Sequence, residues 1–181
     1  MFESRFKEIA DRENGTYKLD KFSAGIFVGS TITSRLPIHV HELSFEYKST
    51  ALNLRYDLGD SNLAYFKCTI NVKHIVPDMT IEAREHLARL FSFKKKNVWK
   101  IKCKDQRMEH TLNELLQSSG LTDIAKAETF EPQISGSFNH TQYQFNTKYY
   151  LGFNDKEHSI EPMIQFYKGF IDYIRSEYVG F

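Results

Sequence analysis

Hydrophobic and polar residues alternate along most of the segment 38–72. The alternation runs through 38–48, 51–58 and 63–72, and short polar turns such as Gly59–Asn62 separate these runs. A period of two is typical of strands that place one face on a core and the other in water. Because tight turns make sequence neighbours into sheet neighbours, we predict an antiparallel meander with these three strands in sequential order.

A helical period of hydrophobic residues occurs in several other segments. The strongest runs from Ile160 to Tyr178, where apolar and aromatic residues fall on one side, Ser159 is expected to cap the first turn and Pro162 lies within it. The other predicted helices are an opening helix that ends at Asn14–Gly15, a helix from Thr80 to about Phe91, a helix capped by Asp105 and stopped by Gly120, and a short helical turn near Ile124.

Three further segments favour strands. Segment 16–33 is expected to hold one or two strands interrupted by Gly25 and Gly29, Val98–Lys104 returns to alternation, and 131–153 predicts a hairpin pair. Helices therefore lie at the ends of the chain and between hairpin-like strands, without regular β-α-β alternation. We predict an α+β fold with a mainly antiparallel sheet, a meander of about five to seven strands, packed on one face by helices that include a long C-terminal helix.

Composition favours one globular domain over 1–181. The chain has 181 residues, of which 41% are hydrophobic and 26% charged, which is too apolar for disorder. No apolar run reaches the roughly 20 residues of a membrane span, and the charged N-terminal segment does not read as a signal peptide. Cys68 and Cys103 are expected to be buried thiols in a reducing compartment. Together these features predict a soluble, cytoplasmic protein.

Sequence motifs for nucleotide or nucleophile chemistry are absent. The pair Gly25 and Gly29 lacks the Lys-Ser/Thr of a phosphate loop, and Ser135–Ser137 lacks the Gly-x-Ser-x-Gly frame. The chain also has no Cys-x-x-Cys and no His-Glu-x-x-His sequence. We therefore expect no cofactor and single out no catalytic residue, although catalytic groups can also converge from distant positions.

His39 and His41 form the most metal-like pattern. Residues i and i+2 of a strand point to the same face, so two imidazoles could coordinate one metal ion there. The histidines considered as a third ligand are His74, His86 and His110. The alternative places both histidines on the water-facing side of a strand whose other side carries Ile38 and Val40. We expect this alternative, and therefore no metal site, because no Cys or carboxylate lies at a matching spacing.

A run of lysines marks the segment 94–104. It begins with the triplet 94–96 and continues with residues that share one face of a predicted strand: Lys100, Lys102 and Lys104. We interpret that face as solvated and as protecting a sheet edge from pairing with another chain. The alternative is an anion-binding surface formed by these three lysines. The net charge of +1 disfavours nucleic acid, and Trp99 is expected to point into the core rather than stack on a base.

The sequence leaves the function open between three hypotheses. The preferred one is a non-catalytic binding or structural domain that acts through contacts with a protein partner or a second copy, because no catalytic constellation stands out. The first alternative is an enzyme with a cleft near His39 and His41. The second is a binder of anionic surfaces or nucleic acid through the lysine stretch 94–104.

Overall fold

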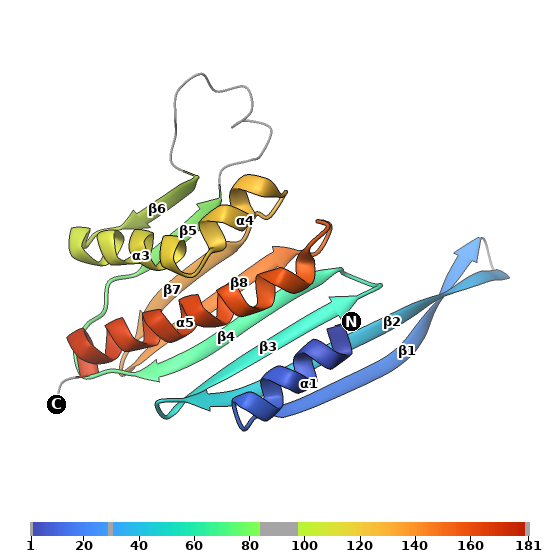
Figure 1. The fold of residues 1–181 in the computed structure, drawn as a ribbon, viewed down its shortest axis with the longest axis horizontal. Coiled ribbons are helices and arrows are strands. Elements are labelled where there is room, and N and C mark those ends of the chain that lie inside the picture. The colour runs from blue at the N-terminus through green and yellow to red at the C-terminus, as the bar shows by residue number, and fades with distance from the viewer. Residues whose placement is uncertain (1, 29–30, 84–97, 180–181) are drawn as a thin grey trace, which may run out of the picture.

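The computed structural model describes residues 2–28, 31–83 and 98–179. Within them, an antiparallel sheet of eight strands has helices packed on one face (Figure 1). The strands are β1 (Thr16–Val28), β2 (Thr31–Tyr47), β3 (Thr50–Leu58), β4 (Leu63–Asn71), β5 (Met79–Ala83), β6 (Trp99–Cys103), β7 (Gln133–Asn139) and β8 (Gln142–Tyr150). The helices are α1 (Phe2–Arg12), α3 (Gln106–Ser118), α4 (Leu121–Ala127), the 3₁₀ turn Lys156–Ser159, α5 (Ile160–Ile174) and the π-helical turn Arg175–Val179. The predicted α+β class is confirmed, with one strand more than the upper expectation.

The strand order is β1-β2-β3-β4-β8-β7-β5-β6. The first four strands follow one another as the alternation predicts, with Leu43 opposite Leu54 and Leu54 opposite Phe66. The sequential order ends at β4, which pairs with β8 rather than with β5. The second half of the sheet therefore joins strands that are distant in sequence, and β6 is its outer edge.

The helix predicted from Thr80 to about Phe91 is wrong over its first residues. Met79–Ala83 is strand β5, which pairs with β6 on one side and β7 on the other. Pairing on both sides satisfies the backbone hydrogen-bonding groups of β5 as fully as a helix would. Met79 and Ile81 face the core, which is the period of two that a strand requires. Residues 84–91 of the prediction lie outside the described ranges.

Two local details of the prediction also differ from the structure. Strand β1 runs through Gly25 without a break, and the hairpin that it forms with β2 extends beyond the rest of the sheet (Figure 1). Ser159 precedes α5, but its side chain does not cap the helix; its hydroxyl donates to the carbonyl of Lys156 instead. By contrast, Asp105 caps α3 as predicted, accepting from the N–H groups of Arg107 and Met108.

The core lies between the sheet and its helices. Strands β3 and β4 alternate between enclosed and exposed side chains, and the enclosed ones belong to one core cluster with residues of α1 and α5. Phe170 of α5 stacks on Phe145 of β8 with ring centroids 4.1 Å apart, and the hydroxyl of Tyr167 donates to the carbonyl of Phe66. Cys68 is also enclosed here, and burial raises the pKa of its thiol to about 12, so it is an inert core residue.

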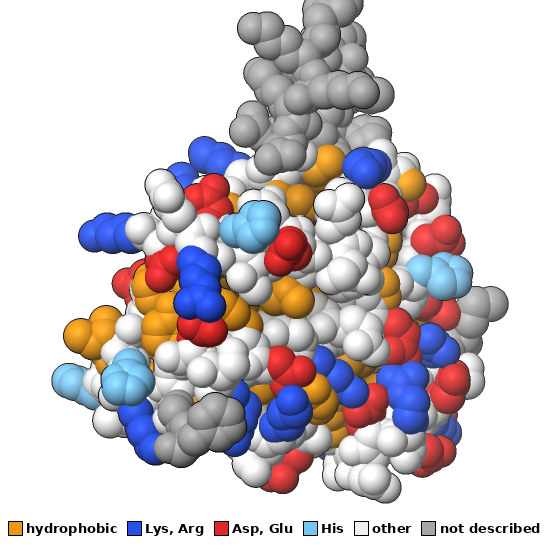
Figure 2. Space-filling view, turned by 60° about the vertical axis from the view of Figure 1, so that its left-hand side comes forward, with side chains coloured by type: hydrophobic (Ala, Val, Ile, Leu, Met, Phe, Trp, Pro, Cys, Tyr) orange, Lys and Arg blue, Asp and Glu red, His pale blue; other side chains and the backbone are white. Residues whose placement is uncertain are grey.

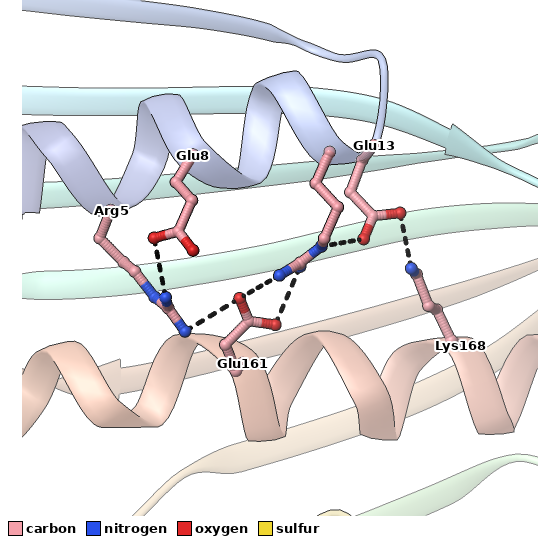
Figure 3. A network of polar contacts seen from close by, with 6 residues as sticks. Arg5, Glu8, Glu13, Glu161 and Lys168 are labelled. Carbon is pink, nitrogen blue, oxygen red and sulfur yellow. Dashed lines mark hydrogen bonds and ion pairs between the residues drawn. The ribbon is translucent and has the colours of Figure 1, made fainter.

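Helices α1 and α5 are joined by a network of ion pairs (Figure 3). The guanidinium of Arg12 makes two hydrogen bonds with Glu161, at 2.8 and 3.0 Å, and Lys168 donates to Glu13 at 2.6 Å. Burial alone would raise the pKa of Glu13, but hydrogen bonds from Lys168 and Arg12 hold it below its ordinary value. This network fixes the N-terminal helix against the C-terminal helix on the covered side of the sheet.

Candidate binding surface on the open sheet face

His41 is buried on the helix-covered face, which contradicts the water-facing position that we expected for it, whereas His39 is exposed. Ile38 and Val40 point to the other face and are also buried. Only 3% of His41 is exposed, and its ring packs against Phe6. Its Nδ1 lies 2.8 Å from the hydroxyl of Tyr17. The error concerns which alternate positions of β2 face the helices. Leu43 and Phe45 are buried in the core, so the odd-numbered positions of β2 lie on the helix-covered face, and both histidines are at odd-numbered positions.

The structure does not bring His41 together with a metal-ligand set. His74 and His110 are exposed, and His86 lies outside the described residues. Within the described residues, no group of three or more His, Cys, Asp or Glu side chains could hold an ion. Burial lowers the pKa of His41, so this imidazole is a neutral core group.

The lysines at positions 100, 102 and 104 lie on the side of the sheet opposite the helices, which we call the open face. Lys100 and Lys102 belong to the edge strand β6, and Lys104 follows it. Trp99 points into the core, as predicted, and its indole N–H donates to the hydroxyl of Thr122. The triplet 94–96 lies outside the described residues.

A row of polar side chains crosses the open face from β4 to β6. The cross-strand partners, taken in the order β4, β8, β7, β5, β6, are Lys67, Asn146, Ser135, Thr80 and Lys102. Residues paired directly across strands project from the same face with Cβ atoms about 5 Å apart. Short amide and hydroxyl side chains therefore form the middle of the row, and a lysine stands at each end.

Two depressions of the surface follow this row. One, of about 500 Å³, is lined by residues of β4, β8, β7 and β5. The other, of about 550 Å³, is lined by residues of β7 and β5 and by Lys102 and Lys104. Both include Thr80 and Ser135, so the two depressions adjoin. We call this combined surface the polar trough.

The trough collects unpaired positive charge. The lysines that line its two depressions are Lys67, Lys102, Lys104 and Lys148, and the carboxylates that line them are Asp78 and Glu82. Lys100 lies 3.9 Å from Glu82. Among the residues that the structure describes, Lys67, Lys102 and Lys104 have no carboxylate within ion-pair distance. Unpaired cations keep their full attraction for an anionic ligand.

The other half of the open face, on β1 to β3, has a different charge pattern. Its cations are paired with neighbouring carboxylates: Lys18 with Asp20 at 2.7 Å and Arg55 with Glu42 at 3.0 Å. The side of the molecule drawn in Figure 2 likewise shows positive and negative side chains intermingled. The trough is thus a local concentration of charge that the net value of +1 conceals.

Two tyrosines lie at the β4 and β8 end of the trough. Tyr65 is half-buried opposite Lys148, whose Nζ is 5.9 Å from the centre of its ring. Tyr150 is 61% exposed and lies two residues further along β8. A side chain at Gly152 would overlap with the Tyr150 ring, so the ring lies directly over that backbone. The exposed ring of Tyr150 and the half-buried ring of Tyr65 thus lie on the same face as the lysines.

Sequence reasoning found the lysines of β6 but missed the rest of this surface. Lys67, Lys148 and Thr80 lie in three separate segments, and only the pairing of β4 with β8 and of β5 with β7 brings them together. The only signal along the chain was local alternation: Lys67 and Thr80 each lie between two apolar residues, whereas Lys148 lies between Thr147 and Tyr149.

Comparison with known proteins does not identify a family for this chain. No protein-family model matches the chain, and no curated protein or solved structure matches it. The described residues also contain no helix that is long and apolar enough to cross a membrane. The function is therefore argued from the arrangement of this chain's own residues.

Proposed function

We propose that this protein is a non-catalytic binding domain and that the polar trough receives an anionic partner. The observation that carries the proposal is the row from Lys67 to Lys102, in which two lysines without an ion pair among the described residues flank short hydrogen-bonding side chains across five strands. Lysine attracts phosphates and carboxylates, and the amide and hydroxyl groups between the lysines both donate and accept hydrogen bonds.

The different surroundings of the two sheet faces support the proposal. Helices enclose one face and supply the main core, so the exposed side chains of the trough are not needed to hold the sheet together. A rigid sheet also presents its outward side chains in fixed positions, which lowers the conformational cost of binding. An edge strand protected by lysines explains Lys100, Lys102 and Lys104, but it does not explain Lys67, which lies at the far end of the row on an inner strand.

The test compares two triple variants of equal net charge. Lys67→Gln, Lys102→Gln and Lys104→Gln remove the unpaired lysines of the trough. Matched control substitutions at exposed lysines elsewhere are Lys7→Gln, Lys18→Gln and Lys126→Gln. Binding is measured by fluorescence anisotropy against two labelled polyanions, an oligothymidylate and a polyglutamate peptide, over a series of salt concentrations.

We expect the wild type to bind at least one polyanion, with an affinity that falls as salt rises, and the control triple to retain most of that affinity. The trough triple should lose it. If the wild type binds neither polyanion, or if both triples lose the same affinity, the trough is not a binding surface and the proposal is wrong.

A further inference from the structure

We infer that the anionic partner of the trough is a single-stranded nucleic acid, a conclusion that rests on the proposed function. Charge alone would suit any polyanion. The additional observation is that an exposed ring, Tyr150, and a half-buried ring, Tyr65, lie beside the lysines on the same face. Proteins that bind single strands combine a positively charged path for the backbone with aromatic rings on which bases stack.

The two tyrosines are placed so that neighbouring bases can use them. Tyr65 lies opposite Lys148 on the adjacent strand, and Tyr150 lies two residues beyond Lys148, so the rings are diagonal neighbours. Diagonal residues on paired strands have Cβ atoms about 7 Å apart. With 61% of its surface exposed, Tyr150 offers a ring face to a ligand, while the backbone of Gly152 supports the ring from below.

The lysines are spaced for a chain of phosphates rather than for a single one. Lys67 on β4 and Lys102 on β6 are separated by four inter-strand steps, which amounts to about 19 Å at the usual strand spacing. Lys148 lies near the tyrosine end, and Lys104 lies beside the β6 end. An extended strand of a few nucleotides that crosses the sheet would pass each of these cations.

The middle of the trough suits the edges of unpaired bases. Asn146, Gln133, Ser135 and Thr80 present amides and hydroxyls, which can donate to and accept from base edges. In a duplex the bases are stacked on each other and cannot reach the tyrosines. An acidic peptide would satisfy the lysines but has no flat π-system to place on the tyrosines. The combination of groups therefore favours a single strand.

The experiment uses the full chain and a fluorescein-labelled oligothymidylate of about twelve nucleotides, a length within the range that single-strand-binding surfaces cover. Tyr65→Leu with Tyr150→Leu removes the stacking surface and keeps apolar bulk. Phe22→Leu is the matched aromatic control, because Phe22 is also exposed on the open face, at 54%, but lies on β1.

The tyrosine and lysine variants should fail in different ways. The double tyrosine variant should bind the oligonucleotide at least about tenfold more weakly, with an unchanged salt dependence, and Phe22→Leu should bind as the wild type does. The lysine triple should make the slope of log affinity against log salt shallower by about two. A labelled duplex of the same length should bind more weakly than the single strand.

Protection of lysines in the unmodified protein is a second measurement that needs no variant. With oligothymidylate present, Lys67, Lys102 and Lys104 should be acetylated more slowly than Lys7, Lys18 and Lys126. Tight binding of polyglutamate without binding of the oligonucleotide would overturn the nucleic-acid inference and leave the proposed function standing. Equal binding of duplex and single strand, or a tyrosine variant that binds as the wild type does, would also overturn it. Binding of neither polyanion would remove both.

Discussion

The residues on the two faces of the sheet alternate along the same strands, yet they meet very different surroundings. On the covered face, aromatic side chains such as Phe145 and Phe170 stack on one another and lose all contact with solvent. On the open face, Lys67, Ser135 and Thr80 remain in water beside two shallow depressions. The comparison indicates that the packed side chains of the covered face supply most of the stability and leave the trough on the open face free to bind. Substitutions on each face test that separation.

The largest expected effect comes from the centre of the covered face. Phe170→Ala removes a fully enclosed ring that stacks on Phe145 and should lower the free energy of unfolding by about 3–5 kcal/mol. Chemical denaturation followed by circular dichroism measures this change. A loss below about 0.5 kcal/mol would mean that α5 does not pack on the sheet as described.

A pair of adjacent residues on β7 sharpens the comparison. Gly136 faces the core, where a Cβ would overlap with the hydroxyl of Tyr143, whereas Ser135 faces the trough. Gly136→Ala should cost about 1–3 kcal/mol of stability through overpacking, and Ser135→Ala should change it by less than about 0.5 kcal/mol. Thermal and chemical denaturation of the two variants side by side gives the answer. Equal losses would show that the face assignment of β7 is wrong.

The elements that depend on short-range patterns could be predicted from the sequence. The strands of the meander and helix α5 follow from short-range periods and from turns that leave little freedom in pairing. Strand β5 was not accessible, because Met79–Ala83 fits either period and only its neighbours β6 and β7 decide between them. The pairing of β4 with β8 is a contact between distant segments that no local pattern specifies.

The candidate site could be predicted from the sequence only in part, because it also depends on pairing between distant segments. Lys100, Lys102 and Lys104 are close in sequence and share a parity, so they were recognised as one surface. Lys67 and Tyr150 join that surface through long-range pairing, and the overall charge of +1 gave no hint of them. Face assignment by parity also failed at His41, since Ile38 and Val40 are as apolar as the core residues beyond them.

The covered face should also respond to pH through His41. Burial lowers the pKa of this imidazole below its ordinary value of 6.5, so the unfolded chain takes up the proton more readily than the folded one. Its contribution to stability is therefore complete above pH 6.5 and is lost as the pH falls through the folded-state pKa. The loss cannot exceed about 1.4 kcal/mol per pH unit for one proton.

Denaturation curves between pH 7.5 and about pH 5 test this assignment. The wild type should lose stability over that interval, and His41→Phe should show a flatter profile although it gives up the hydrogen bond with Tyr17. The carboxylate of Glu13, whose pKa is held low by its hydrogen bonds, titrates in a more acidic window and does not interfere. Parallel profiles for the two proteins would show that His41 is not the responsible group.

The smallest expected effect on stability belongs to the trough itself. Lys67, Lys102 and Lys104 are exposed and have no carboxylate partner among the described residues, so changing all three to Gln should move the free energy of unfolding by less than about 0.5 kcal/mol. Relief of repulsion between like charges would make the variant slightly more stable. The control triple at Lys7, Lys18 and Lys126 breaks surface ion pairs with Glu3, Asp20 and Asp123 and should be slightly less stable. Denaturation of both triples in the buffer of the binding assay decides the matter. If the trough lysines contribute more than about 1 kcal/mol, they hold the sheet together, and lost binding would no longer identify a ligand surface.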